Sequence, residues 1–225
     1  MTMTLEMAMH ERHMVRRYTD KPLSDTIVKR LEARTIENNE KYQLAIALRT
    51  DDNQAFNALI RLVLAKGVKN YFLLAGPDTL DLDEKCGLAG ADLMLYAQTL
   101  GLNTWWVGGT FNRSKLNRSA GANKVIGVIA VGYGADPGKP HASKKPDEVA
   151  EYKGEMPAWF SNGVEAALLA PTALNKQAFR IYGEEDRVRI TCNNGVFSGA
   201  DLGLVKYHFM LGAGKENFRW SDEKN

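Results

Sequence analysis

Between Leu88 and Leu100, apolar residues occur at every angular position of the helix that this stretch predicts. Only Asp92 and Gln98 interrupt the pattern, and Gly101 is expected to end the helix as a C-cap. A helix that is apolar all round must be buried, because each of its sides needs apolar neighbours. The chain is therefore expected to fold around this helix, with other elements covering it.

The size and charge of the chain limit what it binds. It has 225 residues, of which 44% are hydrophobic, so one large domain or two small ones are expected. Its 29 Lys and Arg residues nearly balance its 27 Asp and Glu residues, which leaves a formal net charge of +2. A charge this small gives no strong attraction to nucleic acid or to an anionic membrane, so the expected partner is a small molecule.

The cysteines, the N-terminal segment and the apolar runs indicate where in the cell the protein is located. Cys86 and Cys192 are too few for a disulfide framework and lack metal-ligand spacing, so we expect no metal site. Charged residues are scattered through the segment from Met1 to Val15, which indicates no signal peptide. Apolar runs such as 125–131 are much shorter than the roughly 20 residues of a membrane-spanning helix. We expect a cytoplasmic protein.

Hydrophobic periodicity, turn residues and β-branched runs predict the remaining elements. The predicted helices cover residues 25–38, 52–65, 159–169 and 198–211, and the predicted strands cover 42–49, 71–75, 104–107, 125–131, 178–182 and 188–192. The segment 135–156 is polar and contains three prolines, so it is expected to be an irregular surface connection.

A short sequence repeat suggests an internal duplication. Gly90-Ala91-Asp92-Leu93-Met94-Leu95 recurs as Gly199-Ala200-Asp201-Leu202-Gly203-Leu204. Such a repeat fits a single domain of two diverged halves, about 1–134 and 157–225, joined by the polar loop 135–156. The alternative is chance, because Gly and Asp are common at helix starts. We favour the duplication, and the alternative stays open on these residues alone.

Common catalytic and nucleotide-binding motifs are missing from the chain. It contains no GxGxxG, no phosphate-binding loop ending in Gly-Lys-Ser/Thr, no HExxH and no GxSxG. Four other segments suit a phosphorylated planar ligand: the basic segment 12–18, the Trp-Gly-Gly segment 105–111, the basic segment 141–146 and the polar segment 170–177. Arginines bind phosphate with paired hydrogen bonds, and glycines let backbone N–H groups approach a flat ring. Taken singly, each segment also fits a solvated basic face, a tight turn or an ordinary loop.

In combination, the four segments resemble the FMN-dependent nitroreductase family. Residues 12–18 are similar to the family's Arg-rich start, and residues 87–111 to its central helix with the Trp-x-Gly-Gly-x-Phe strand end. Residues 144–146 are similar to its basic Lys-Pro tail, and residues 170–177 to its Ala-Pro-Ser-x-x-Asn-x-Gln segment. Two features depart from the family. The Ala-Pro segment lies late in the chain, as in a rearranged subgroup, and Met14 stands where a phosphate-binding hydroxyl is usual.

The resemblance implies an α+β fold of the nitroreductase type, with a central mixed or antiparallel sheet flanked by helices. It also implies a role for each matching residue. The FMN phosphate would be bound by Arg12, His13, Lys144 and Lys145. Arg16 would lie near the pyrimidine edge as the electrostatic catalyst, and the N5 and O4 atoms would face Gly108 and Gly109. Another edge of the flavin would be lined by Pro171, Thr172, Ala173 and Asn175. In a typical family homodimer this last segment comes from the partner. Whether it acts within one chain or across a dimer is open at this point.

The implied activity is a two-step hydride transfer, in which NADH or NADPH reduces FMN and the reduced flavin then reduces a flat, electron-poor acceptor. A nitroaromatic or a quinone would stack near Trp105, Trp106 or Phe111. One alternative is a flavin- or ligand-binding protein of the same fold without turnover. Another is a related enzyme with a different acceptor, such as a dehalogenase or a flavin-fragmenting enzyme.

Overall fold

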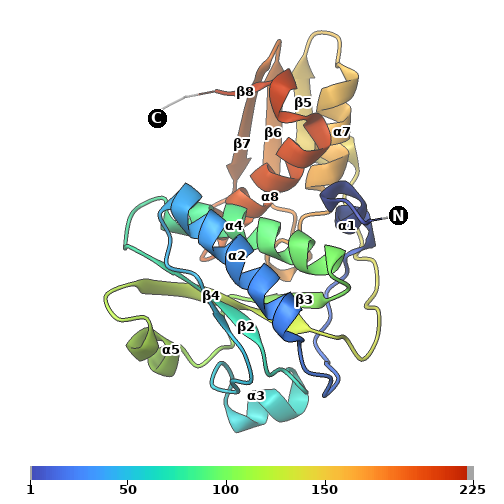
Figure 1. Cartoon of the computed structure of the whole chain (residues 1–225). Helices are drawn as coiled ribbons and strands as arrows, with labels where there is room; N and C mark the ends of the chain where they lie inside the picture. The colour runs from blue at the N-terminus through green and yellow to red at the C-terminus, as the bar shows by residue number, and fades with distance from the viewer. Residues whose placement is uncertain (1, 222–225) are drawn as a thin grey trace.

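The computed structural model describes residues 2–221, which form two connected lobes, each built on a four-stranded sheet (Figure 1). The first lobe contains α2 (Asp25–Tyr42), β1 (Ala47–Arg49), α3 (Ala58–Val63), β2 (Tyr71–Gly76), α4 (Leu82–Thr99), β3 (Asn103–Val107), α5 (Arg113–Ser119) and β4 (Lys124–Gly132). The second contains α6 (Pro146–Val149), β5 (Ala150–Lys153), α7 (Ala158–Ala167), β6 (Phe179–Glu184), β7 (Arg187–Cys192), α8 (Ser198–Ala213) and β8 (Arg219–Trp220). Helix α1 (Leu5–Glu11) packs against α4 and α8.

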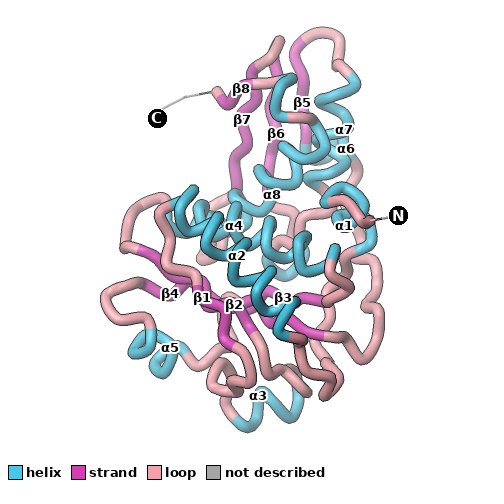
Figure 2. Tube along the Cα trace, in the orientation of Figure 1, coloured by secondary structure: helices cyan, strands magenta, loops and turns pink. Residues whose placement is uncertain are grey.

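The strands lie in two separate groups (Figure 2), and the two sheets differ in strand direction. In the first sheet the order is β1-β2-β4-β3 and every pair is antiparallel. In the second, the order is β5-β6-β7-β8, with an antiparallel β6-β7 pair between two parallel pairs. The predicted α+β class, with mixed and antiparallel sheets flanked by helices, is confirmed.

Helices α4 and α8 pack against each other where the lobes meet. Both helices have glycines at the contact: a Cβ on Gly87 would lie 2.3 Å from the Ala200 carbonyl oxygen, and one on Gly203 would lie 2.0 Å from that of Glu84. Larger residues at either position would therefore push the helices apart. The predicted buried central helix is confirmed, although it begins at Leu82, six residues before Leu88.

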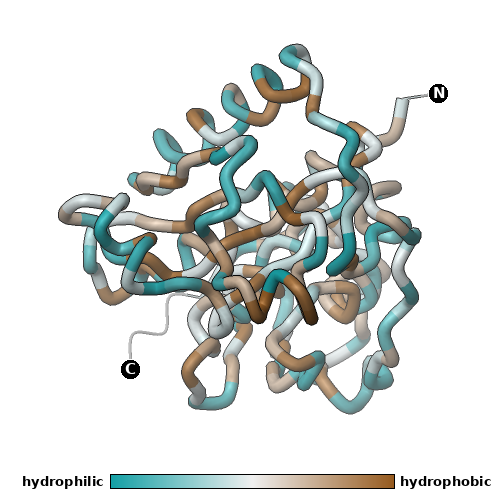
Figure 3. The backbone as a smooth tube through the Cα atoms, turned by 90° about the horizontal axis from the view of Figure 1, so that it is seen from below, coloured by the Kyte–Doolittle hydropathy of each residue, from teal (hydrophilic) through white to brown (hydrophobic). Residues whose placement is uncertain are grey.

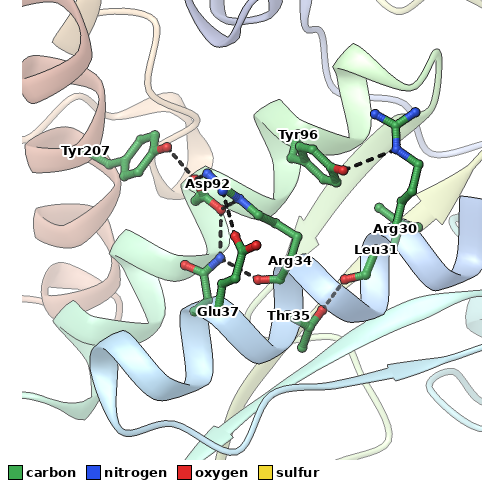
Figure 4. Close-up of polar contacts among 9 residues, drawn as sticks. Arg30, Leu31, Arg34, Thr35, Glu37, Asp92, Tyr96 and Tyr207 are labelled. Carbon is green, nitrogen blue, oxygen red and sulfur yellow. Dashed lines mark hydrogen bonds and ion pairs between the residues drawn. The ribbon is translucent and has the colours of Figure 1, made fainter.

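The buried carboxylate of α4 belongs to Asp92, and a polar cluster supplies its hydrogen bonds (Figure 4). The carboxylate of Asp92 accepts hydrogen bonds from Arg34 Nε at 2.7 Å and Nη2 at 2.6 Å, Asn38 Nδ2 at 2.7 Å and the Tyr207 hydroxyl at 2.5 Å. Burial, together with the negative charge of Asp92, raises the pKa of Tyr207 above its usual range. The cluster joins α2 and α4 of the first lobe to α8 of the second.

The elements repeat along the chain in a register that differs from the sequence repeat. Strands β2 and β7 start at Tyr71 and Arg187, helices α4 and α8 at Leu82 and Ser198, and strands β3 and β8 at Asn103 and Arg219, so each start lies 116 residues after its counterpart. The six-residue motifs lie 109 residues apart, which is seven residues out of this register. The spacing of elements supports a duplication, but the motif match does not align the two helices correctly.

The polar segment 135–156 is more regular than expected. Pro146 begins the short helix α6, where a proline needs no N–H partner, and β5 then pairs in parallel with β6 at the edge of the second sheet. The expectation of an irregular connection is therefore wrong for its second half. Other predicted helices and strands are confirmed with shifted ends; the largest shift is in the 52–65 helix, which covers only Ala58–Val63.

Apolar side chains form two cores. The larger surrounds α4 and α8 and reaches into both lobes, while the smaller lies on the other face of the first sheet and includes Phe56, Trp105 and Phe111. Figure 3 shows hydrophobic segments crossing the middle of the molecule. Within residues 2–221, no helix has the length and hydropathy needed to cross a membrane.

Candidate functional site

The basic N-terminal segment lies along the edge of the first sheet. Met14 forms a parallel bridge with Thr104 of β3, and the Val15 N–H donates to the Thr104 carbonyl oxygen at 3.2 Å. The chain after β4 then returns to this segment, because a Cβ on Gly138 would lie 2.7 Å from Cβ of His13. Two of the predicted segments, 12–18 and 105–111, therefore start side by side.

The segments 141–146 and 170–177 form one hydrogen-bonded unit around Gln177, whose side chain is buried. Lys144 donates its backbone N–H to Gln177 Oε1 at 2.7 Å and its Nζ to the Gln177 carbonyl oxygen at 2.8 Å. Asn175 Nδ2 donates to the Ala142 carbonyl oxygen at 2.7 Å. These bonds hold the basic segment against the polar one, which the resemblance predicts for two walls of one site.

Arg12 is a buried cation without an acidic partner in the described chain. It follows the last residue of α1 and is only 6% exposed, and burial lowers the pKa of its guanidinium to about 10. No carboxylate of residues 2–221 forms an ion pair with it. A buried charge is costly unless it is paired, so this position favours binding of an anion.

A buried histidine lies near Arg12, and a second histidine lies near the first. His208 of α8 is fully buried, and its Nε2 has no hydrogen-bond partner within residues 2–221. Burial lowers the pKa of His208 to about 3, and the charges of Arg12 and His141 contribute to this lowering. His141 also contacts the Leu168 carbonyl oxygen through Nε2 at 3.0 Å. His141 belongs to the same unit as Lys144, because its Nε2 lies 3.4 Å from Gln177 Nε2.

The glycine pair at the end of β3 lies against the second lobe. A Cβ on Gly108 would lie 2.6 Å from Cε1 of Phe197, and one on Gly109 would lie 3.7 Å from Cζ of the same ring. The guanidinium carbon of Arg16 lies 5.3 Å from the ring centroid of Trp105, within cation–π range. The residues predicted to face a flavin ring therefore have aromatic neighbours from both lobes.

Asp201 in the first turn of α8 anchors the polar segment. Its Oδ1 accepts a hydrogen bond from the Ala173 N–H at 2.9 Å, and burial raises its pKa to about 6. Thr172 Oγ1 accepts from the Gln177 N–H at 3.1 Å. Both bonds fix the backbone of the segment that the resemblance places on one edge of the flavin.

The family model for the "Putative TM nitroreductase" family matches residues 4–213. The chain belongs to this nitroreductase family. A putative nitroreductase from Thermotoga maritima has a similar structure, with a TM-score of 0.71 and 18% identity over 96% of this chain and 86% of its own. The predicted family membership and fold are confirmed. No curated protein matches the sequence.

Two other nitroreductase-fold proteins match part of this nitroreductase. A nitroreductase-like protein from Streptococcus mutans is 15% identical, covers 64% of this chain and 95% of its own, and has a TM-score of 0.53. A putative nitroreductase from Desulfovibrio desulfuricans, in complex with FMN, is 19% identical, covers 68% and 98%, and has a TM-score of 0.51. Nearly all of each shorter protein thus corresponds to about two thirds of this chain, which has additional structure.

The structure pairs the segment 12–18 with β3 and the segment 141–146 with 170–177, and it places two of the predicted residues less favourably. Lys145 is exposed at the start of α6, where its N–H donates to Glu148 Oε2 at 2.7 Å. His13 is half-buried beside Gly138. Their roles at a phosphate stay predictions, as do the roles of the other predicted residues.

Sequence reasoning did not assign site roles to Phe197, Asp201 or His208. Asp201 lies in the repeated motif, but Asp is common at helix starts, so the motif does not indicate a site role. Phe197 is the one aromatic residue between β7 and α8, but nothing in the sequence places it at Gly108. Within residues 2–221, no cluster of three or more His, Cys, Asp or Glu side chains has the arrangement of a metal site.

Proposed function

We propose that this nitroreductase is an FMN-dependent enzyme that uses NADH or NADPH to reduce a flat, electron-poor acceptor, such as a nitroaromatic or a quinone. The observation that carries this proposal is the buried guanidinium of Arg12, which lacks an acidic partner within residues 2–221. A phosphate dianion would supply the missing negative charge and accept paired hydrogen bonds from Arg12. The FMN in the Desulfovibrio desulfuricans nitroreductase supports the choice of ligand.

The residues around Arg12 fit the phosphate end of FMN. Lys144 belongs to the unit that adjoins His141, and the charge of His141 acts on the same buried His208 as that of Arg12. We assign phosphate binding to Arg12 and Lys144, with His13 at the rim. Because His208 stays neutral at working pH, it adds no second buried charge that would repel Arg12.

The residues beyond the phosphate fit the ring of FMN. When bound, FMN supplies a ring that accepts a hydride from the nicotinamide and passes two electrons to the acceptor. Arg16 would stabilise negative charge at the pyrimidine edge, while the backbone N–H groups of Gly108 and Gly109 would orient the edge that contains N5. The Asp201 bond fixes the backbone at Ala173, so the segment 171–175 is preorganised along another edge.

We further propose that one chain completes the site. The contact of Gly108 with Phe197 joins the two lobes within a single chain, and Asp201, four residues after Phe197, binds the Ala173 N–H, which supports this proposal. A homodimer is thus not needed to supply the Ala-Pro segment. We also propose a cytoplasmic location, which the free thiols of Cys86 and Cys192 support.

The test begins with purified protein incubated with FMN and then dialysed. We expect a yellow protein with about one FMN per chain, bleached under anaerobic conditions by NADH or NADPH and reoxidised by a nitroaromatic or a quinone. A protein that stays colourless would contradict the proposal. A yellow protein that neither nicotinamide bleaches would instead support a flavin-binding protein without turnover.

A further inference from the structure

The loop between β7 and α8 brings an aromatic ring from the second lobe to the glycine pair of the first. Phe197 directly precedes α8, and its carbonyl oxygen accepts the Asp201 N–H at 2.9 Å, so helix formation holds its backbone. Its ring edge would lie 2.6 Å from a Cβ on Gly108 and 3.7 Å from one on Gly109. The same two glycines are those that we assign to the N5 edge of the flavin.

The close approach explains why residue 108 is a glycine. Gly108 does not have the positive φ that favours glycine, so its backbone does not require one. The separation of 2.6 Å is far below a normal carbon–carbon contact, so a methyl group there would displace the Phe197 ring. The packing of Phe197 is thus a reason for this glycine that is independent of any ligand.

The residues just before Phe197 are exposed. Val196 is 87% exposed, and an added Cβ on Gly195 would meet no atom within 4 Å. The Phe197 side chain itself is partly exposed.

We propose that Phe197 is a specificity-determining residue that limits the size of the acceptor, a role that rests on the proposed function. The ring occupies space beside the glycine pair, where an acceptor must come close to N5. A flat single-ring acceptor can stack against the Phe197 ring, whereas a bulky polycyclic acceptor must displace it. Phe197 therefore favours small aromatic acceptors over large ones.

The contact itself can be tested without any ligand. The variants Gly108→Ala, Phe197→Ala and their combination form a double-mutant cycle, measured by urea denaturation. We expect Gly108→Ala to lower stability clearly in the parent protein and to have a much smaller effect when residue 197 is Ala, because the added methyl group then meets no ring. Additive effects would contradict the packing on which the proposal depends.

The role is tested by the ratio of kcat/KM for a bulky polycyclic quinone to that for a single-ring quinone, with saturating FMN. In Phe197→Ala we expect this ratio to rise about tenfold, in line with the energy of one aromatic contact. Phe197→Trp should lower the ratio, and Val196→Ala, a neighbour without contact to the glycines, should leave it unchanged.

The outcomes separate this proposal from the proposed function. An unchanged ratio in a Phe197→Ala protein that binds FMN and is bleached by a nicotinamide would overturn the role of Phe197 alone. Much tighter FMN binding by Phe197→Ala would also overturn it, because the ring would then occupy the space of the flavin. Failure of the parent protein to bind FMN would overturn both.

Discussion

Replacing Arg12 by Met should stabilise the protein without FMN and weaken FMN binding. Burial lowers the pKa of Arg12 to about 10, and each tenfold change in proton affinity corresponds to about 1.4 kcal/mol, so the buried charge costs about 3 kcal/mol. Because the folded pKa is below the unfolded one, this cost is fully present at neutral pH and decreases only as pH rises above about 10. Methionine fills similar space without a charge, so a gain of up to about 3 kcal/mol is expected.

The same substitution removes the principal cation at the phosphate. A charge-assisted hydrogen bond contributes about 1.5–3 kcal/mol, so Kd for FMN should rise roughly 10-fold to 150-fold. Urea denaturation of the apoprotein gives the first quantity, and quenching of FMN fluorescence on binding gives the second. Arg17→Met is the matched control, because Arg17 is exposed and forms only a 3.7 Å surface ion pair with Asp136, so both quantities should change little.

Opposite signs of the two effects are what distinguish a binding residue from a structural one. If Arg12→Met destabilised the apoprotein, the cation would have favourable partners in the fold and the reasoning from its missing acid would fail. If Arg12→Met stabilised the apoprotein but left FMN affinity unchanged, Arg12 would not bind the FMN phosphate.

Three further substitutions test other parts of the structure. The pKa of Asp201 is raised to about 6, so its ionised form lowers the free energy of unfolding above pH 6, and this destabilisation disappears as the pH falls toward 4. Asp201→Asn should therefore raise the free energy of unfolding by about 1–2 kcal/mol at pH 7.5, after allowance for partial exposure, and change it little at pH 4. Urea denaturation at the two pH values measures both. Asp92→Ala should cost about 3–5 kcal/mol in the same assay because it leaves buried donors unpaired, and a loss below 1 kcal/mol would contradict the importance of the cluster. Lys144→Met should weaken FMN binding about tenfold or more, because the Gln177 carbonyl oxygen holds the Lys144 ammonium in place at 2.8 Å, whereas Lys145→Met should change Kd less than twofold; equal effects would contradict the assignment of the phosphate to Lys144.

The parts of the fold that were predictable are those in which a strong local pattern coincides with burial. The all-round apolar stretch at Leu88–Leu100 has no stable position except inside a core, and the structure buries it. Helix α1, helix α5 and strand β8 were not predicted, because seven or fewer residues give too few repeats of a period to stand out. Strand β5 is polar, and its pairing with β6 depends on the packing of the second lobe and not on its own sequence.

The site was predictable by residue type and much less by position. The charge run 12–18 did not show which cation would be buried, because burial of Arg12 depends on its place between α1 and the packed helices. Likewise, the contact between Gly108 and Phe197 joins two lobes, and no local pattern indicates it. The family resemblance supplied the candidate residues. The packing of α4 on α8 joins the two lobes from which those residues come.

The 116-residue spacing of elements predicts that the proposed flavin site occurs once per chain. The first-lobe positions that correspond to Phe197 and Asp201 are Asp81 and Lys85, which form an ion pair with each other at 2.9 Å. That pair has no aromatic ring to cover a glycine pair and no carboxylate free to anchor a loop as Asp201 does. The first sheet also has β4 between β2 and β3, while β7 and β8 pair directly. We therefore expect the two lobes to supply complementary halves of one proposed site, which a bound ratio near two FMN per chain would contradict.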